Sequence, residues 1–148
     1  MSITILPHDP RWKGLGPTVR RAVEAALRHQ RINHVAVTVV LTDDAEIRTL
    51  NHTYRAKSKP TNVLAFPDGA EENGIRQLGD IVMSYDTIRT EASVQEKSLK
   101  AHISHLAVHG TLHLLGYDHG SEHEANIMES HEIAILACMA IANPYESS

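Results

Sequence analysis

The chain has 148 residues, of which 42% are apolar and 22% charged, and this balance predicts a single domain over residues 1–148 with a sizeable core. The net charge of −4 argues against a generally basic nucleic-acid binder, although residues 1–60 hold ten Lys and Arg against five Asp and Glu. No apolar run has the length of a membrane span and the N-terminus lacks a signal-peptide pattern, so we expect a cytoplasmic protein with no membrane partner.

The first half of the chain alternates predicted strands and helices. Residues 3–6 and the β-branched run at 35–41 predict strands. Between them, residues 17–29 have the apolar spacing of a helix, with a proline in the first turn. The arginines of this helix either face an anionic partner or simply solvate its outer surface. A second helix is expected to begin at the capping residues 42–44 and to end near Tyr54.

The second half begins with a basic loop at residues 55–61, which leads into two further strands. These strands are predicted at 62–66 and 78–84, with a polar loop at 68–76 between them. Because no helix separates the two strands, we expect a hairpin and therefore a mixed sheet. Helical patterns follow at residues 86–96, 99–115 and 121–141.

This order of elements predicts a small α+β domain with a mixed β-sheet and helices mainly on one face. The helix at 99–115 carries a broad apolar stripe and is expected to be central and largely buried. The one cysteine, Cys138, lies in the apolar run at 133–142, which favours a buried inert thiol over a nucleophile.

The segment HGTLHLLGYDH at residues 109–119 has the histidine spacing of a metal site. His109 and His113 are four residues apart, so on a helix they share one face and can bind the same ion. Gly116 can end the helix in a left-handed conformation and let His119 turn back toward the metal. Pairs of histidines at this spacing are common by chance, but the full three-histidine frame is much more specific. Three imidazoles with an open fourth position are typical of a catalytic zinc site.

Other polar residues near the motif have weaker assignments. His105 and His113 lie about 12 Å apart along the helix axis, which is too far for both to bind one ion. His123 and His131 are expected at the surface of the last helix rather than in contact with the metal ligands. Asp118 either orients a ligand imidazole or is a plain turn residue.

The residue after the first histidine is Gly110, where zinc peptidases with this frame have a glutamate as general base. Its absence removes the commonest peptidase mechanism but does not forbid phosphodiester cleavage. Without a side chain, Gly110 could let substrate or a neighbouring element approach the helix. Asp80 is either an auxiliary base or a structural residue at a strand bend beside Gly79.

Three segments together resemble the signature blocks of the YbeY family, the bacterial rRNA-maturation endoribonucleases: HGTLHLLGYDH, LNHTYRAKSKPTNVLAFP at 50–67 and LGDIVMS at 78–84. The resemblance implies a zincin-like α+β fold and one Zn²⁺ per chain, held by His109, His113 and His119. It also implies metal-dependent cleavage of single-stranded RNA, with roles in 16S rRNA 3′-end maturation and in late-stage 70S ribosome quality control. The implied partners are 16S rRNA and ribosomal subunits.

The resemblance also assigns a catalytic arginine to Arg55, which opens the basic loop that contains Lys57 and Lys59. A guanidinium can bind a phosphodiester bidentately and stabilise developing charge. Three positions of the chain depart from the residues that the family often has: Ala56, Ser58 and Ala65. They affect the expected shape of the RNA-facing loop and none of the metal ligands.

The sequence thus favours a zinc endoribonuclease that acts on rRNA. One alternative is another zinc-dependent hydrolase, including a divergent peptidase. The other is a non-catalytic ribosome-assembly factor in which the zinc is structural.

Overall fold

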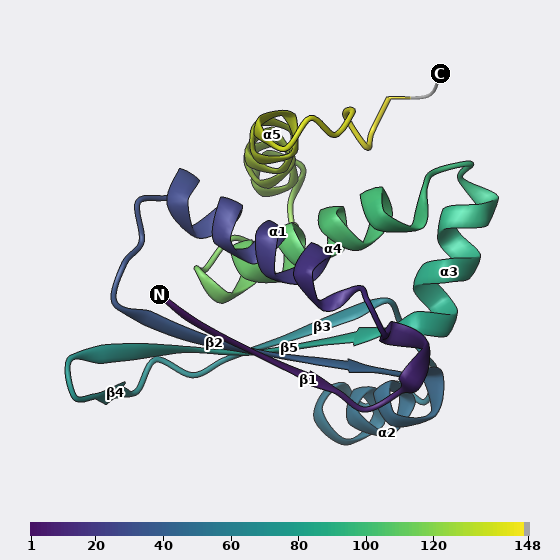
Figure 1. Ribbon diagram of the computed structural model, residues 1–148, viewed down its shortest axis with the longest axis horizontal. Helices are drawn as coiled ribbons and strands as arrows, with labels where there is room; N and C mark the ends of the chain where they lie inside the picture. The colour runs from purple at the N-terminus through teal and green to yellow at the C-terminus, as the bar shows by residue number, and fades with distance from the viewer. Residues whose placement is uncertain (147–148) are drawn as a thin grey trace.

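The computed structural model describes residues 1–146, which form one mixed β-sheet flanked by helices (Figure 1). Across the sheet the strands run in the order β1 (Ser2–Pro7), β2 (Val35–Thr42), β5 (Ile75–Ser84) and β3 (Val63–Pro67). The first three strands are parallel, whereas β3 pairs antiparallel with β5. The predicted mixed sheet is therefore confirmed, and β3 lies at its edge.

The helices lie mainly on one face of this sheet, as predicted. Helices α1 (Gly16–His29) and α4 (Leu99–Leu114) cover that face, and α5 (Glu122–Cys138) lies over them (Figure 1). Helix α2 (Asp44–Arg55) packs on the opposite face, and α3 (Tyr85–Val94) stands at one end. A short 3-10 helix, η1 (Pro10–Trp12), was not predicted from the sequence.

The alternation of side chains along β2 explains this division. Val37 and Val39 are buried in the large core on the α1 and α4 side, whereas Val40 points the other way and packs beside Ile47 of α2. Helix α4 contributes buried residues around most of its circumference, so the prediction of a central helix is confirmed. No helix in the described part of the chain is long and apolar enough to cross a membrane.

The prediction of a polar loop at residues 68–76 was wrong for its second half. Residues Glu71–Glu72 form a short strand, β4, that pairs with the beginning of β5, so β5 starts at Ile75. Asn73 and Gly74, with φ of 53° and 79°, make the connecting turn. Two positive φ angles at Asn-Gly are typical of a tight hairpin turn whose twist matches that of the strands.

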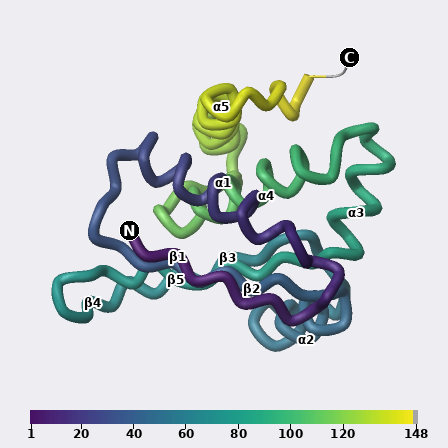
Figure 2. The backbone as a smooth tube through the Cα atoms, in the orientation of Figure 1, coloured from purple at the N-terminus to yellow at the C-terminus, as the bar shows by residue number. Residues whose placement is uncertain are grey.

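The last helix is shorter than predicted, and the prediction for Cys138 was wrong. Helix α5 ends at Cys138, and Ala140 follows in a left-handed conformation with φ of 59°. Cys138 is exposed at the end of this last helical turn. The chain then runs toward the connection between α3 and α4 (Figure 2), where the Lys97 ammonium donates a hydrogen bond to the Pro144 carbonyl.

Candidate metal centre

Three imidazoles converge at the C-terminal end of α4. One nitrogen from each of His109, His113 and His119 lies within 4.8 Å of the others. The Nε2 atoms of His109 and His113 are 3.1 Å apart. Two nitrogens that bind one zinc ion at 2.0–2.1 Å with a tetrahedral angle lie about 3.3 Å apart, so this spacing fits a shared ion. The three histidines could therefore hold one metal ion.

The end of α4 brings His119 back to the other two histidines in the predicted way. Gly116 has φ of 102°, a left-handed conformation that side chains rarely adopt. The Gly116 amide donates to the His113 carbonyl and the Tyr117 amide to the Leu112 carbonyl, which is the hydrogen-bond pattern of a glycine-terminated helix. After this reversal, the His119 ring lies 5.3 Å from that of His109, nearly parallel to it.

The candidate ligand His113 is suited to bind a metal near neutral pH. Burial, together with the neighbouring rings of His109 and His119, lowers the pKa of His113 to about 4. A neutral imidazole keeps a free lone pair, which is the form that binds a metal.

A buried carboxylate, which the sequence did not reveal, lies beside the histidines. Glu132 of α5 is fully buried and accepts hydrogen bonds from His105 Nε2 at 2.7 Å and from His109 Nδ1 at 2.8 Å. The Tyr145 hydroxyl also donates to it. His105 is thus bound to Glu132, consistent with its predicted exclusion from the metal ligands.

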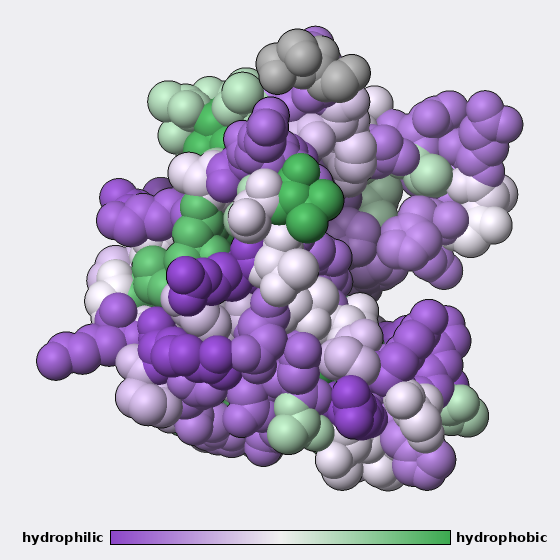
Figure 3. Space-filling view, turned by 90° about the vertical axis from the view of Figure 1, so that its right-hand side faces the viewer, coloured by the Kyte–Doolittle hydropathy of each residue, from purple (hydrophilic) through white to green (hydrophobic). Residues whose placement is uncertain are grey.

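A cleft of about 730 Å³ opens beside the histidines. One wall contains the three histidines with Gly110 and the turn after α4, and the other consists of residues between 51 and 67. This second wall includes Arg55, Lys57 and Lys59, so three cations share the cleft with the candidate ligands. Figure 3 shows a mainly hydrophilic surface, with one edge indented, on the side of the molecule nearest α3.

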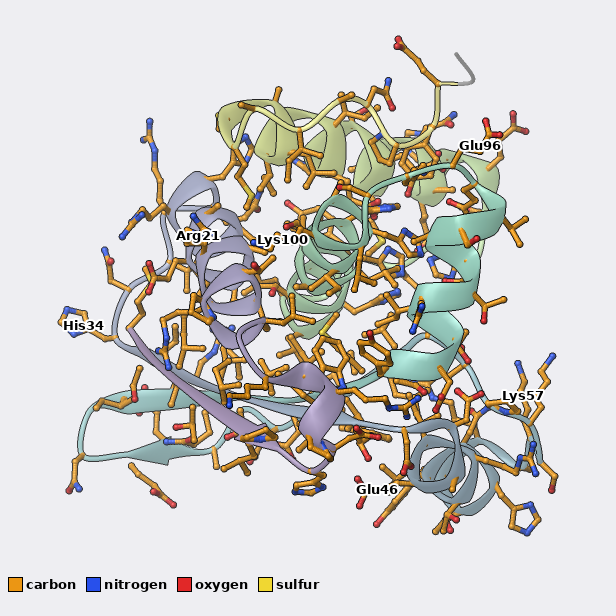
Figure 4. All side chains as sticks on the ribbon, turned by 45° about the vertical axis from the view of Figure 1, so that its right-hand side comes forward. Arg21, His34, Glu46, Lys57, Glu96 and Lys100 are labelled. Atoms are coloured by element: carbon orange, nitrogen blue, oxygen red, sulfur yellow. The ribbon has the colours of Figure 1, made fainter. Side chains whose placement is uncertain are left out.

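The basic wall is held in place by α2 and β3. The buried Asn51 side chain donates a hydrogen bond to the Lys59 carbonyl, and Ala56 ends α2 with φ of 55°. The Arg55 guanidinium donates to the Ala65 carbonyl at 3.2 Å and lies 5.9 Å from the centre of the Phe66 ring. These contacts use only part of its five N–H donors, so the others are free to bind an anion. Lys57 projects outward from the loop (Figure 4).

Gly110 allows the sheet to approach α4 closely. A Cβ atom at this position would lie 3.1 Å from Cγ2 of Ile81 and 3.4 Å from Cγ2 of Val63. The glycine thus accommodates β5 and β3 while also lining the cleft. Of the two roles considered for the missing side chain, close approach of a neighbouring element is the one seen here.

The other candidate residues lie outside the histidine group. Asp80 is exposed and alternates with the buried Ile81, so it points to the α2 side of the sheet and away from α4. Asp80 follows Gly79 and the register shift at Leu78, which favours the structural role. Asp118 accepts from the His119 amide, as a turn residue does. His123 is exposed as expected, but His131 is half-buried beside Tyr117.

The geometry defines a class of protein: one with three histidines that could hold a metal ion, beside a cationic cleft suited to an anionic substrate. Residues 11–140 match the family model described as Endoribonuclease YbeY. The chain is 47% identical over 135 residues to the Endoribonuclease YbeY of Bradyrhizobium diazoefficiens, covering 86% of this chain and 74% of that one. It is 40% identical over 153 residues to the Endoribonuclease YbeY of Azorhizobium caulinodans, covering 98% of this chain and 96% of that one. The chain belongs to the YbeY endoribonuclease family.

A solved structure supports the fold independently. The chain is similar to the solution structure of TM1509 from Thermotoga maritima, with a TM-score of 0.60 and 24% identity, over 99% of this chain and 97% of that one. The resemblance to the YbeY family and the α+β fold with a mixed sheet predicted from the sequence are both confirmed.

Proposed function

We propose that the protein is a zinc-dependent endoribonuclease that cleaves single-stranded RNA, with 16S rRNA as its substrate during 3′-end maturation. By the same proposal it acts in late-stage 70S ribosome quality control, in contact with ribosomal subunits. The observation that supports it best is that Arg55 and the three histidines line one cleft. A phosphate-binding Arg55 that faces three candidate metal ligands across one cleft would suit metal-assisted phosphodiester cleavage.

The donor set favours zinc. Three imidazoles with a 3.1 Å spacing between two of their nitrogens fit the short bonds of a zinc site. Closed structural sites have four protein ligands, whereas this group has three and its third member, His119, is exposed toward the cleft. When bound, the ion would act as a Lewis acid at the phosphoryl group. This openness favours a catalytic role over the structural zinc of an assembly factor.

The protein's own groups would bind and orient the RNA. Arg55, held through the Ala65 carbonyl, would donate its remaining N–H groups to a phosphodiester oxygen and stabilise negative charge as the bond breaks. Lys57 and Lys59 would neutralise neighbouring phosphates without fixing their geometry. A peptidase mechanism lacks support, because Gly110 supplies no general base and a side chain added at this position would point toward the sheet.

The test combines metal analysis with RNA cleavage. We expect about one zinc per chain by elemental analysis, and cleavage of a single-stranded RNA that carries the precursor 3′ end of 16S rRNA. A chelator should abolish cleavage and added zinc should restore it, while a duplex of the same sequence should be cut poorly. Zinc-loaded protein whose preparation cuts RNA equally well with chelator would indicate a contaminating nuclease, and the assembly-factor alternative would then be preferred.

A further inference from the structure

Glu132 is a fully buried carboxylate with no role in the proposed function so far. Both of its oxygens are used: Oε1 accepts from His105 Nε2 and the Tyr145 hydroxyl, and Oε2 accepts from His109 Nδ1. Burial of a lone carboxylate is costly, and it is tolerated when the group is fully hydrogen-bonded or paired with a cation.

The charge of Glu132 determines which nitrogen of His109 carries hydrogen. An ionised carboxylate only accepts hydrogen bonds, so the proton of a neutral His109 must lie on Nδ1. The lone pair is then on Nε2, which is the nitrogen that lies 3.1 Å from His113 Nε2. The same hydrogen bond fixes the rotation of the ring. Glu132 therefore acts on the ligand from the side opposite the cleft.

We propose that Glu132 is a positioning residue for the metal centre, which orients His109 and places a buried negative charge behind the bound cation. Carboxylates that accept from a ligand histidine raise its basicity and typically contribute 10–100-fold to metal affinity. Tyr145 completes the arrangement from the segment after α5, so the C-terminal part of the described chain supports the site. This inference rests on the proposed metal site but not on RNA cleavage.

A second imidazole–carboxylate pair provides a control, and its histidine lies two turns earlier than His109 on α4. His102 is buried and its Nε2 is 2.9 Å from Glu91 Oε1, so it forms a second imidazole–carboxylate pair. Glu91 comes from α3, and neither residue belongs to the histidine group that could hold the metal. Glu91→Gln removes a carboxylate charge from this more exposed pair, 32% exposed at Glu91 against 0% at Glu132, and so it reports the cost of losing such a charge beside α4 but away from the histidine group.

The experiment measures zinc affinity by competition with a chelator at one neutral pH, for the full chain and for Glu132→Gln and Glu91→Gln. The amide of Glu132→Gln retains the size of the side chain and removes its charge. We expect a 10–100-fold weaker zinc affinity for Glu132→Gln and unchanged affinity for Glu91→Gln. The visible spectrum of bound Co²⁺ should also change in the first variant alone, because it reports ligand orientation.

Circular dichroism melting of the metal-free proteins separates positioning from folding. Equal zinc affinity in folded Glu132→Gln and in the unaltered chain would overturn the inference, as would an equal loss in Glu91→Gln. If Glu132→Gln does not fold, the zinc affinity of Tyr145→Phe tests the inference instead, because this variant removes one hydroxyl donor to Glu132 and keeps the carboxylate. We expect a severalfold weaker zinc affinity, and no change would overturn the inference. Absence of zinc binding by the unaltered chain would instead overturn the proposed function.

Discussion

The two walls of the cleft are built in different ways. The histidine wall is the end of a buried helix, where a glycine-terminated turn and a buried glutamate fix the rings. The basic wall is a loop whose residues 55–59 are exposed, anchored mainly through the buried Asn51. Metal ligands must converge to within a fraction of an ångström, whereas long cations can reach phosphates from a range of positions. The histidine wall is thus fixed by many contacts, as metal binding needs, whereas the basic wall is a loop, which is sufficient for binding phosphates.

This contrast predicts how the protein responds to substitution. Changes in the histidine wall should remove metal binding altogether or affect folding, because each group there has a fixed contact. Changes in the basic wall should leave the metal and the fold intact and should affect only RNA. Variants from the two walls therefore test whether the cleft works as one site.

The largest effect is expected for His113→Ala, which removes one of the three candidate ligands. Zinc content should fall to near zero and RNA cleavage to background, since two imidazoles bind zinc far more weakly than three. The half-buried side chain contributes little to the core, so the melting temperature of the metal-free protein should change by only a few degrees.

His123→Ala is the control for this variant, because His123 is exposed on α5 and outside the histidine group. It should retain both zinc and cleavage. Stoichiometric zinc in His113→Ala would remove this residue from the metal site. Loss of folding together with the metal would support a structural zinc.

The next largest effect is expected for Arg55→Ala. Loss of a donor that stabilises transition-state charge typically lowers the rate by about 100–1,000-fold, and zinc content should stay at that of the unaltered chain. Arg55→Lys keeps the charge but loses the planar fork, so it should recover only part of the rate. Single-turnover cleavage assays would measure these rates.

Arg48→Ala provides the comparison, because Arg48 is an exposed arginine of α2 that does not line the cleft. Its rate should match that of the unaltered chain. Equal rates for Arg55→Ala and Arg48→Ala would show that Arg55 is only a surface residue.

A smaller effect, on stability, is expected for Gly110→Glu, which restores the residue that zinc peptidases have at this position. Its Cβ would press on Ile81 and Val63, and such overpacking costs about 1–3 kcal/mol. Urea unfolding would measure the loss, with Gly110→Ala as the comparison. For alanine, the gain in helix propensity of about 1 kcal/mol offsets part of the strain. Unchanged stability of Gly110→Glu would mean that the sheet moves aside, and peptide hydrolysis should then be assayed.

Short-range patterns predicted most of the fold and the three candidate ligands. The β-branched run of β2 and the helical spacing of α4 each depend on residues that are close in sequence. The histidines also lie within eleven residues, 109–119, so one helix end brings them together. The turn at Gly116 could be predicted because few residues other than glycine adopt its backbone conformation.

What could not be predicted depends on contacts between distant parts of the chain. Glu132 reaches His109 only because α5 packs across α4, and nothing local distinguishes it from the other acids of α5. Asp80 is unavailable to the cleft for another long-range reason, since the register of β5 against β2 after the irregularity at Leu78 decides the face on which it lies. The Asn73-Gly74 hairpin, by contrast, carries a local signal, because Asn-Gly favours two consecutive positive φ angles.

The smallest effects are expected for Lys57→Ala and Lys59→Ala, which test the basic wall directly. Each exposed lysine should contribute a phosphate contact, so each loss should weaken single-stranded RNA binding severalfold at low salt. The slope of log affinity against log salt should fall by about 0.7 for each contact removed. Lys13→Ala, an exposed lysine away from the cleft, should leave the slope unchanged. If both cleft variants keep the slope of the unaltered chain, RNA does not follow this loop, and Arg55 would have to act without a basic wall.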